Sequence, residues 1–331
     1  MDYSKTIGID VSKLTLDVNV LPDGKFCQVE NNVQGITKLF RWLSKDCKVN
    51  LADALFAFEQ TGFYSYKLAV CLQEKGYAFV ILSGLELKRS LGISRGKSDT
   101  TDAGRIAEYA ILRKCQLVPT QMPEKVIEQM KRLLALRDKL VKQRAGYKAS
   151  VGEAKQAIEK KEDPLYFKVQ EDLIKNLDNN IDLLDQELLN LVQNHPVLKT
   201  QFDLIVSIKS VGTQTALYMI AVTHAFTKFA NWRKFACYAG IAPFPYQSGT
   251  SIRGKTKVSH LANKQAKSIL GNITGNAIQW NTEMKLYYQK RLAEGKNKMS
   301  TQNIIRNKLL ARIFAVIDRG TPYVETMNYA A

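Results

Sequence analysis

The first 120 residues alternate between short apolar runs and segments with apolar residues at helical spacing. The runs are rich in β-branched and aromatic residues, as in strands, whereas Ile36, Leu39, Phe40 and Leu43 recur three and four residues apart, as on one helix face. The predicted strands are 6–11, 14–20, 26–29, 54–59 and 78–82, and the predicted helices are 33–43, 63–74 and 99–112. Strands interleaved with helices after an opening β-meander predict an α/β domain with a mixed sheet.

Between residues 126 and 194 the pattern is helical throughout. Apolar residues recur at three- and four-residue spacing on both sides of a break at Asp163-Pro164, and His195-Pro196 ends the segment. Two long amphipathic helices joined by a proline-bearing turn predict an antiparallel hairpin or coiled coil. Two helices packed within one domain are the plainer alternative, although their length favours a protruding arm or a dimerisation element.

The last third is mostly helical by pattern, with an interruption near residues 240–254. We therefore predict three domains: an α/β domain at 1–122, a helical hairpin at 123–196 and a mostly α domain at 197–331. A chain of 331 residues is long enough for about two or more domains with their own cores.

Charge separates the last third from the rest. Residues 231–331 contain sixteen Lys or Arg against four Asp or Glu, an excess of 12 within the overall +17. A solvated basic face is the plainer interpretation of a single charge run, but an imbalance this large favours a polyanionic partner. Nucleic acid is a better candidate than an anionic membrane, because no segment is typical of an amphipathic membrane anchor.

Cysteine usage and hydropathy limit the class of protein further. The five cysteines are scattered and never form a CxxC pair, which indicates reduced thiols and a cytoplasmic location rather than a zinc ribbon or a secreted scaffold. No apolar run approaches the roughly 20 residues that span a bilayer, and residues 1–5 do not have the pattern of a signal peptide. We expect no membrane partner.

Four carboxylates stand out by position. Asp10 and Glu59 lie at the ends of predicted strands, where α/β folds place their chemistry, and Asp99 and Asp102 are three residues apart at a predicted helix start. If the four converge, their mutual repulsion requires a cation, and oxygen-rich sites of this kind suit Mg²⁺ and two-metal phosphoryl transfer. A helix N-cap at Asp99 with Asp102 in the first turn is an equally good local interpretation of that pair.

The segments around these acids resemble the RuvC-like (RNase H-like) DEDD domain of a family of insertion-sequence transposases. The resemblance rests on Ile7-Gly8-Ile9-Asp10-Val11-Ser12-Lys13, Phe58-Glu59-Gln60-Thr61-Gly62 and Lys97-Ser98-Asp99-Thr100-Thr101-Asp102-Ala103. That family joins the DEDD domain to a C-terminal serine domain and includes the pilin-gene invertase. The resemblance implies that Asp10, Glu59, Asp99 and Asp102 are the catalytic, Mg²⁺-binding set.

The C-terminal third carries the second part of the same resemblance. Residues 235–243, followed by Tyr246-Gln247-Ser248-Gly249, look like the segment of the family that contains the nucleophilic serine, which implies Ser248. From the residues alone a Ser-Gly pair is more often a turn, Ser251 is a credible competitor, and no His–Asp partner supports a protease-like triad. A serine that attacks a DNA phosphate needs cations nearby, and Arg253 is close in sequence.

Residues 207–216 are similar to a helix-hairpin-helix, whose backbone amides bind a DNA phosphate. Ser210 stands where the first glycine is usual, and this weakens the similarity because serine tolerates positive φ poorly. An ordinary corner between two helices is the alternative. Across both parts, the candidate nucleic-acid-binding residues are Lys97, Lys209, Arg253, Lys255, Lys257, Lys264 and Lys267.

The resemblance implies a DNA transposase or recombinase that uses a serine nucleophile and Mg²⁺, with a structured guide RNA that selects the donor and target sequences. We also expect a homo-oligomer, a dimer or a tetramer. Three alternatives remain from the residues. They are a RuvC-like junction resolvase or nuclease with a non-catalytic C-terminal domain, an architectural nucleic-acid binder, and an actin-like sugar kinase. The kinase is the weakest, because no Gly-rich adenosine motif follows the N-terminal Gly-Ile-Asp-Val-Ser.

Overall fold

The chain folds into two compact units, Met1–Met122 and Pro123–Ala331. The computed structural model describes residues 3–90, 99–249 and 252–325, and of residues 99–100, 248 and 252–253 it describes the backbone alone. Within these ranges, no helix is long and apolar enough to cross a membrane. The three-domain division predicted from the sequence remains a prediction.

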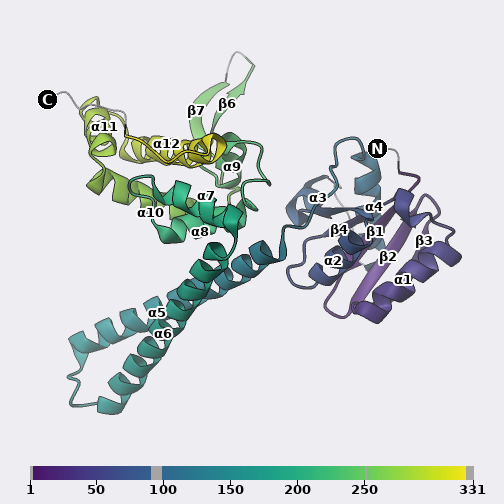
Figure 1. Ribbon diagram of the computed structural model, residues 1–331, viewed down its shortest axis with the longest axis horizontal. Coiled ribbons are helices and arrows are strands. Elements are labelled where there is room, and N and C mark those ends of the chain that lie inside the picture. Colours follow the sequence, from purple (N-terminus) through teal and green to yellow (C-terminus); the bar gives the residue numbers. More distant parts are fainter. Residues whose placement is uncertain (1–2, 91–98, 250–251, 326–331) are drawn as a thin grey trace. The chain divides into compact units, whose positions relative to one another are not determined.

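The first unit is built on a five-stranded mixed sheet of order β3-β2-β1-β4-β5 (Figure 1). The strands are β1 (Lys5–Val11), β2 (Thr15–Leu21), β3 (Lys25–Glu30), β4 (Ala54–Glu59) and β5 (Ala78–Leu82). Antiparallel pairing joins β1 to β2 and β2 to β3, whereas β1–β4 and β4–β5 are parallel. The predicted mixed sheet and all five predicted strands are confirmed.

Helices cover both faces of this sheet. They are α1 (Val33–Lys45), the short 3-10 turn η1 (Leu51–Asp53), α2 (Tyr66–Glu74), α3 (Gly84–Ser90) and α4 (Asp99–Leu112). The core on one face joins Ile7 and Ile9 to residues of α1 and α2, and the core on the other joins Ala57 to Ile106 of α4. Helices α1, α2 and α4 were predicted; α3, one short segment with a single buried residue, Leu87, was not.

Gly8 sets how closely α4 approaches the sheet. A Cβ atom at residue 8 would lie 2.2 Å from the carbonyl oxygen of Ala103 and 2.5 Å from the amide nitrogen of Ala107. Only a residue without a side chain fits this contact between strand and helix. The first turns of α4, which contain Asp102, are therefore held directly against β1.

The second unit begins with the predicted helical hairpin, α5 (Lys125–Ala157) and α6 (Pro164–Gln193), drawn in teal in Figure 1. Asp163 caps α6 by accepting a hydrogen bond from the amide of Tyr166, and Pro164 occupies the first turn, where no amide donor is needed. Proline and the cap therefore mark the helix start that the sequence predicts.

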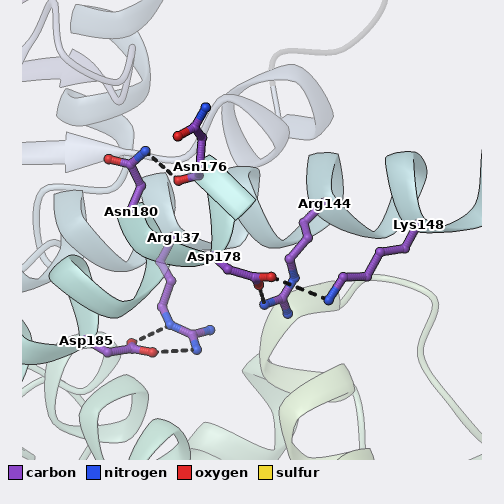
Figure 2. A network of polar contacts seen from close by, with 7 residues as sticks. All are labelled: Arg137, Arg144, Lys148, Asn176, Asp178, Asn180 and Asp185. Carbon is purple, nitrogen blue, oxygen red and sulfur yellow. Dashed lines mark hydrogen bonds and ion pairs between the residues drawn. The ribbon is translucent and has the colours of Figure 1, made fainter. Parts of the chain in front are cut away.

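Ion pairs fasten the two helices of the hairpin to each other (Figure 2). Arg137 on α5 donates two hydrogen bonds to Asp185 on α6, of 2.5 and 2.9 Å, and Arg144 and Lys148 both contact Asp178. The side-chain amide of Gln214, in the later helix α8 (Thr213–Val222), also donates to Asp185, at 2.8 Å. This hydrogen bond links the α5–α6 hairpin to the helical body that follows it in the chain.

That body contains the second core and one β-hairpin. Its elements are α7 (Pro196–Val206), α8 (Thr213–Val222), α9 (Trp232–Tyr238), β6 (Pro243–Ser248), β7 (Ile252–Val258), α10 (Lys264–Trp280), α11 (Thr282–Ala293) and α12 (Lys298–Arg319). The antiparallel pair β6–β7 stands away from the helices (Figure 1). It is the interruption that the sequence indicates near 240–254, but its two strands were not predicted.

Candidate active site

Asp10 and Glu59 lie at neighbouring positions on one face of the sheet. In the parallel pairing of β1 with β4, Ile9 is opposite Phe58, so each acid is one residue further along its own strand. Side chains alternate along a strand, and Asp10 is two residues after Gly8, which faces α4. Glu59 is likewise two residues after Ala57, which packs against α4, so both acids are on the α4 face.

Helix α4 carries the second pair of acids. It begins at Asp99, and Asp102 lies in its first turn, where it accepts a hydrogen bond of 3.0 Å from Arg105. Ala103, the next residue, is one of the two residues of α4, with Ala107, that lie against Gly8 of β1. Asp99 and Asp102 therefore lie in the first turn of α4, and α4 packs against β1, the strand that contains Asp10.

No group of three or more metal-binding side chains lies close together among the side chains that the structure describes. The carboxylate of Asp99 is outside that set. The sheet thus brings Asp10 and Glu59 to one edge of one face and α4 brings Asp102 to the same face, without closing a metal cage from these three.

A further carboxylate, missed from the sequence, lies directly across from Asp10. Asp17 of β2 pairs with Asp10 in the antiparallel ladder, is only 3% exposed and accepts a hydrogen bond of 2.8 Å from Gln28 of β3. A lone acid inside the run Leu16-Asp17-Val18 is the signal that marks it, because strands rarely bury an acid without a partner. It adds negative charge to the face that carries Asp10.

Glu59 has a closely fitting neighbour at the start of α3. A Cβ atom at Gly84 would lie 1.9 Å from Oε1 of Glu59, so the carboxylate occupies the space that a side chain at residue 84 would take. The absence of a side chain at Gly84 is what leaves room for Glu59 in this position.

Ser248 is the last residue of β6, and the ladder pairs it with Ile252 of β7. Gly249 follows with φ +56°, the left-handed conformation that suits glycine at a tight turn. The competing Ser251, like Lys97, lies outside the described residues, and the side chains of Ser248 and Arg253 are not described. Lys255 and Lys257 of β7 are both exposed.

The base of this β-hairpin is anchored to the helices. The carbonyl oxygen of Ile241 accepts hydrogen bonds from the side-chain amides of Asn303 and Asn307 on α12, at 2.9 and 3.1 Å. Gly240 has φ +64°, and a Cβ atom there would lie 2.2 Å from Cβ of Ala262. Only glycine meets both requirements at the entrance to the hairpin.

The turn between α7 and α8 contains one residue with the left-handed backbone that is usual for glycine in a helix-hairpin-helix. Ser210 adopts φ +79° although it is not glycine, and its hydroxyl is buried without a hydrogen-bond partner in the described structure. Gly212 is the N-cap of α8. Lys209, next to the turn, is half exposed and lies 3.8 Å from Glu325. The left-handed conformation is present, at a cost in strain.

The other basic candidates are spread over α10. Lys264 begins the helix after the cap Asn263, and Lys267 lies one turn later. By contrast, cations on α12 are used inside the fold: Lys308 lies 3.7 Å from the ring centre of Tyr287, and burial lowers the pKa of its ammonium. Not every basic residue of the last third is therefore available to a polyanion.

Comparison with known proteins identifies the family. A model described as a transposase, of the DEDD and IS110 type, matches residues 7–153, and one described as the transposase IS116/IS110/IS902 family matches residues 203–289. The chain is 27% identical over 328 residues to pilin gene-inverting proteins of Moraxella lacunata and Moraxella bovis, covering 97% of this chain and 98% of each relative. It is also 26% identical over 144 residues to an insertion element IS110 protein of Streptomyces coelicolor, covering 44% of this chain and 34% of that protein.

The first match includes the positions of all four acids, and the second includes Ser248. The first match spans the sheet unit and most of α5, and the second lies in the helical unit and includes its β-hairpin. This protein belongs to the IS110 family of transposases, enzymes that cleave and exchange DNA strands.

Proposed function

We propose that this transposase exchanges DNA strands through a covalent link between DNA and Ser248, with Mg²⁺ held by Asp10, Glu59, Asp99 and Asp102. The observation that carries the proposal is the shared sheet face of Asp10 and Glu59, with the first turn of α4 against the same strand. The Moraxella relatives, which match over nearly the whole chain, are named for inverting a pilin gene, and this supports strand exchange rather than simple cleavage.

The proposed chemistry is two successive transesterifications. In the first, the hydroxyl of Ser248 loses its proton, an Oγ–P bond forms, one P–O bond of the DNA backbone breaks, and the freed sugar oxygen takes up a proton. In the second, the sugar hydroxyl of another strand attacks the phosphoserine, loses its proton and releases Ser248 as the free alcohol. Bonds of the same type form and break, so the strand is rejoined without hydrolysis or an external energy source.

The donor set fits a hard divalent cation, because carboxylate oxygens are the ligands that Mg²⁺ prefers. Asp10, Glu59, Asp99 and Asp102 would hold it, and when bound it neutralises charge that develops on the phosphate. The exposed Lys255 and Lys257 of β7, together with Lys97, Lys209, Arg253, Lys264 and Lys267, are proposed to bind the nucleic-acid backbone.

Partners beyond DNA belong to the same proposal. A structured RNA that selects donor and target sequences follows from the family resemblance and is compatible with the basic last third. Assembly into a homo-oligomer is the second partner that we propose. Sequencing RNA that copurifies with the protein tests the first: one enriched transcript from beside its own reading frame supports guidance, whereas random fragments contradict it.

Trapping the protein–DNA adduct tests the nucleophile. Wild-type protein, Ser248→Ala and the matched control Ser251→Ala are incubated with labelled substrate DNA and Mg²⁺, denatured and resolved by electrophoresis. We expect an adduct with wild type and Ser251→Ala only. If the adduct is lost only in Ser251→Ala, the nucleophile is Ser251. If Ser248→Ala still cleaves strands and no adduct forms, the protein is a nuclease instead.

We further propose that the carboxylates and the serine that act on one phosphate come from different copies of the chain. Mixing Asp10→Ala with Ser248→Ala protein then restores part of the activity that each lacks alone. If the mixture stays inactive while wild type mixed with either variant is active, the sharing of sites between copies is rejected.

A further inference from the structure

The part of the β6–β7 hairpin nearest its base lines a cavity that the proposed chemistry does not use. The cavity has a volume of about 510 Å³, within the ~300–1,000 Å³ range of sites that hold small organic ligands. Its lining combines aromatic rings, backbone and lysines, and contains no carboxylate. The lining residues are Phe244, Pro245, Tyr246, Gly254, Lys255, Lys257, Val258 and Ser259.

Two aromatic rings are presented at this cavity rather than buried. Phe244 and Tyr246 are 45% and 68% exposed. They are two residues apart in β6, and both line the cavity, although the ladder is irregular between them. Two exposed rings beside one cavity form an apolar surface that a partner can cover.

The fit between Tyr246 and Gly254 holds one of these rings in place. The two residues are opposite each other in the ladder, and a Cβ atom at Gly254 would lie 2.7 Å from Cδ1 of Tyr246. The ring therefore packs over the bare backbone of the glycine, which covers it on one side and leaves the rest of it exposed. Such packing of a ring on a strand glycine fixes its orientation.

Positive charge flanks the rings. Lys257 is directly opposite Phe244 in the ladder, and Lys255 follows Gly254. Both lysines are exposed, and neither forms a salt bridge with any residue that the structure describes. A flat aromatic surface beside unneutralised ammonium groups matches a nucleotide, whose base stacks and whose phosphate is anionic.

We propose that Tyr246 and Phe244 form a stacking platform for unpaired bases of a DNA strand, with Lys255 and Lys257 on its phosphates. Duplex bases already stack on each other, so only a single-stranded or flipped-out nucleotide offers a free face to the rings. Ser248 is two residues beyond Tyr246 in the same strand. The platform thus holds melted DNA beside the residue that, in the proposed function on which this inference rests, forms the covalent link.

Equilibrium binding of a fluorescent oligothymidylate tests the platform in a Ser248→Ala background, where no chemistry interferes. Tyr246→Leu keeps an apolar cover over Gly254 but removes the aromatic face, Tyr246→Phe retains it, and Tyr166→Leu changes an exposed tyrosine in the α5–α6 hairpin as the matched control. We expect Tyr246→Leu to weaken single-strand binding roughly 5- to 150-fold, the value of one stacked base. Tyr246→Phe and Tyr166→Leu are expected to stay near wild type.

Duplex DNA of the same length separates stacking from charge. Tyr246→Leu should leave duplex binding unchanged, whereas Lys255→Ala and Lys257→Ala weaken both forms. Equal losses for duplex and single strand, or no loss for single strand, overturn the platform. Tighter, Tyr246-dependent binding of the matching RNA assigns the rings to RNA and overturns the DNA proposal.

Adduct trapping distinguishes this inference from the proposed function. If Tyr246→Leu does not weaken single-strand binding but Ser248 still forms an adduct, the platform is rejected and the proposed function is retained. Single-strand binding that depends on Tyr246, in a protein whose Ser248 forms no adduct, keeps the platform and rejects the nucleophile.

Discussion

The carboxylate of Glu59 occupies the space beside Gly84 that any other residue would fill with its side chain. Gly84 has an ordinary backbone conformation at the start of α3, so its lack of a side chain, and not its flexibility, is what the fold uses. Gly84→Ala should displace Glu59 and reduce Mg²⁺-dependent strand cleavage by at least tenfold, with the unfolding temperature unchanged or slightly raised. Cleavage near the wild-type rate would mean that the position of Glu59 is not critical.

Gly8→Ala tests the contact between β1 and α4. The new Cβ atom would overlap backbone atoms of Ala103 and Ala107, which cannot move without shifting the helix. We expect the free energy of unfolding of the first unit to fall by about 1–3 kcal/mol in urea denaturation. Gly146→Ala is the control: nothing lies within 4 Å of its Cβ position in α5, so it should stabilise the helix by up to ~1 kcal/mol.

Ser210→Gly should stabilise the second unit. The left-handed conformation of Ser210 costs about 1–2 kcal/mol, part of which is offset because glycine is more flexible in the unfolded chain. Removing the buried, unpartnered hydroxyl adds to the gain, so a net increase of about 1 kcal/mol is expected in chemical denaturation. Ser210→Ala removes the hydroxyl but keeps the strain, and should gain less; if the alanine variant equals the glycine variant, backbone strain is not the cause.

His224 should make the second unit less stable in acid. Burial, with smaller contributions from Lys131 and Lys228, lowers its pKa from 6.5 to about 3 in the folded protein. Between these two values the unfolded chain binds the extra proton, so the free energy of unfolding falls as the pH falls from 6.5 towards 3. Because the imidazole is partly exposed, we expect a loss of only about 1 kcal/mol between pH 7 and pH 5.

His224→Asn is the matched variant, because asparagine tolerates the φ of +52° at this position and does not titrate. Urea denaturation at pH 7 and pH 5 should show a smaller pH dependence for the variant than for wild type. Identical pH dependence in both proteins would place the acid sensitivity in other groups.

The elements of the sheet unit follow from sequence because their apolar pattern is strong. Strands such as 54–59 are buried along nearly their whole length, and helices such as α1 place Ile36, Leu39 and Leu43 on one buried face. The fold class was predicted correctly on this basis, whereas the family resemblance, which the comparisons confirm, rested on the motifs around the acids and Ser248. The predicted site residues stay predictions, although the parallel pairing of β1 with β4 puts Asp10 and Glu59 at neighbouring positions.

The β6–β7 hairpin could not be predicted from the sequence, for a physical reason. Its residues from 254 to 257 are exposed and β6 contains Pro243 and Pro245, so neither strand shows the alternation that a buried face imposes. The pairing of Asp17 with Asp10 was also beyond sequence alone, because it depends on the register of β1 with β2. Long-range register is a property of the assembled sheet.

The side-chain amides of Asn303 and Asn307 on α12 both bind the carbonyl oxygen of Ile241, which fixes the base of the β6–β7 hairpin. From that base the six residues of β6 extend roughly 20 Å, and Ser248 ends them. The proposed nucleophile, held at the far end of this anchored hairpin, does not require the double helix to lie among the helices. The phosphate can be met outside the body of the enzyme, where two DNA molecules have room to change partners.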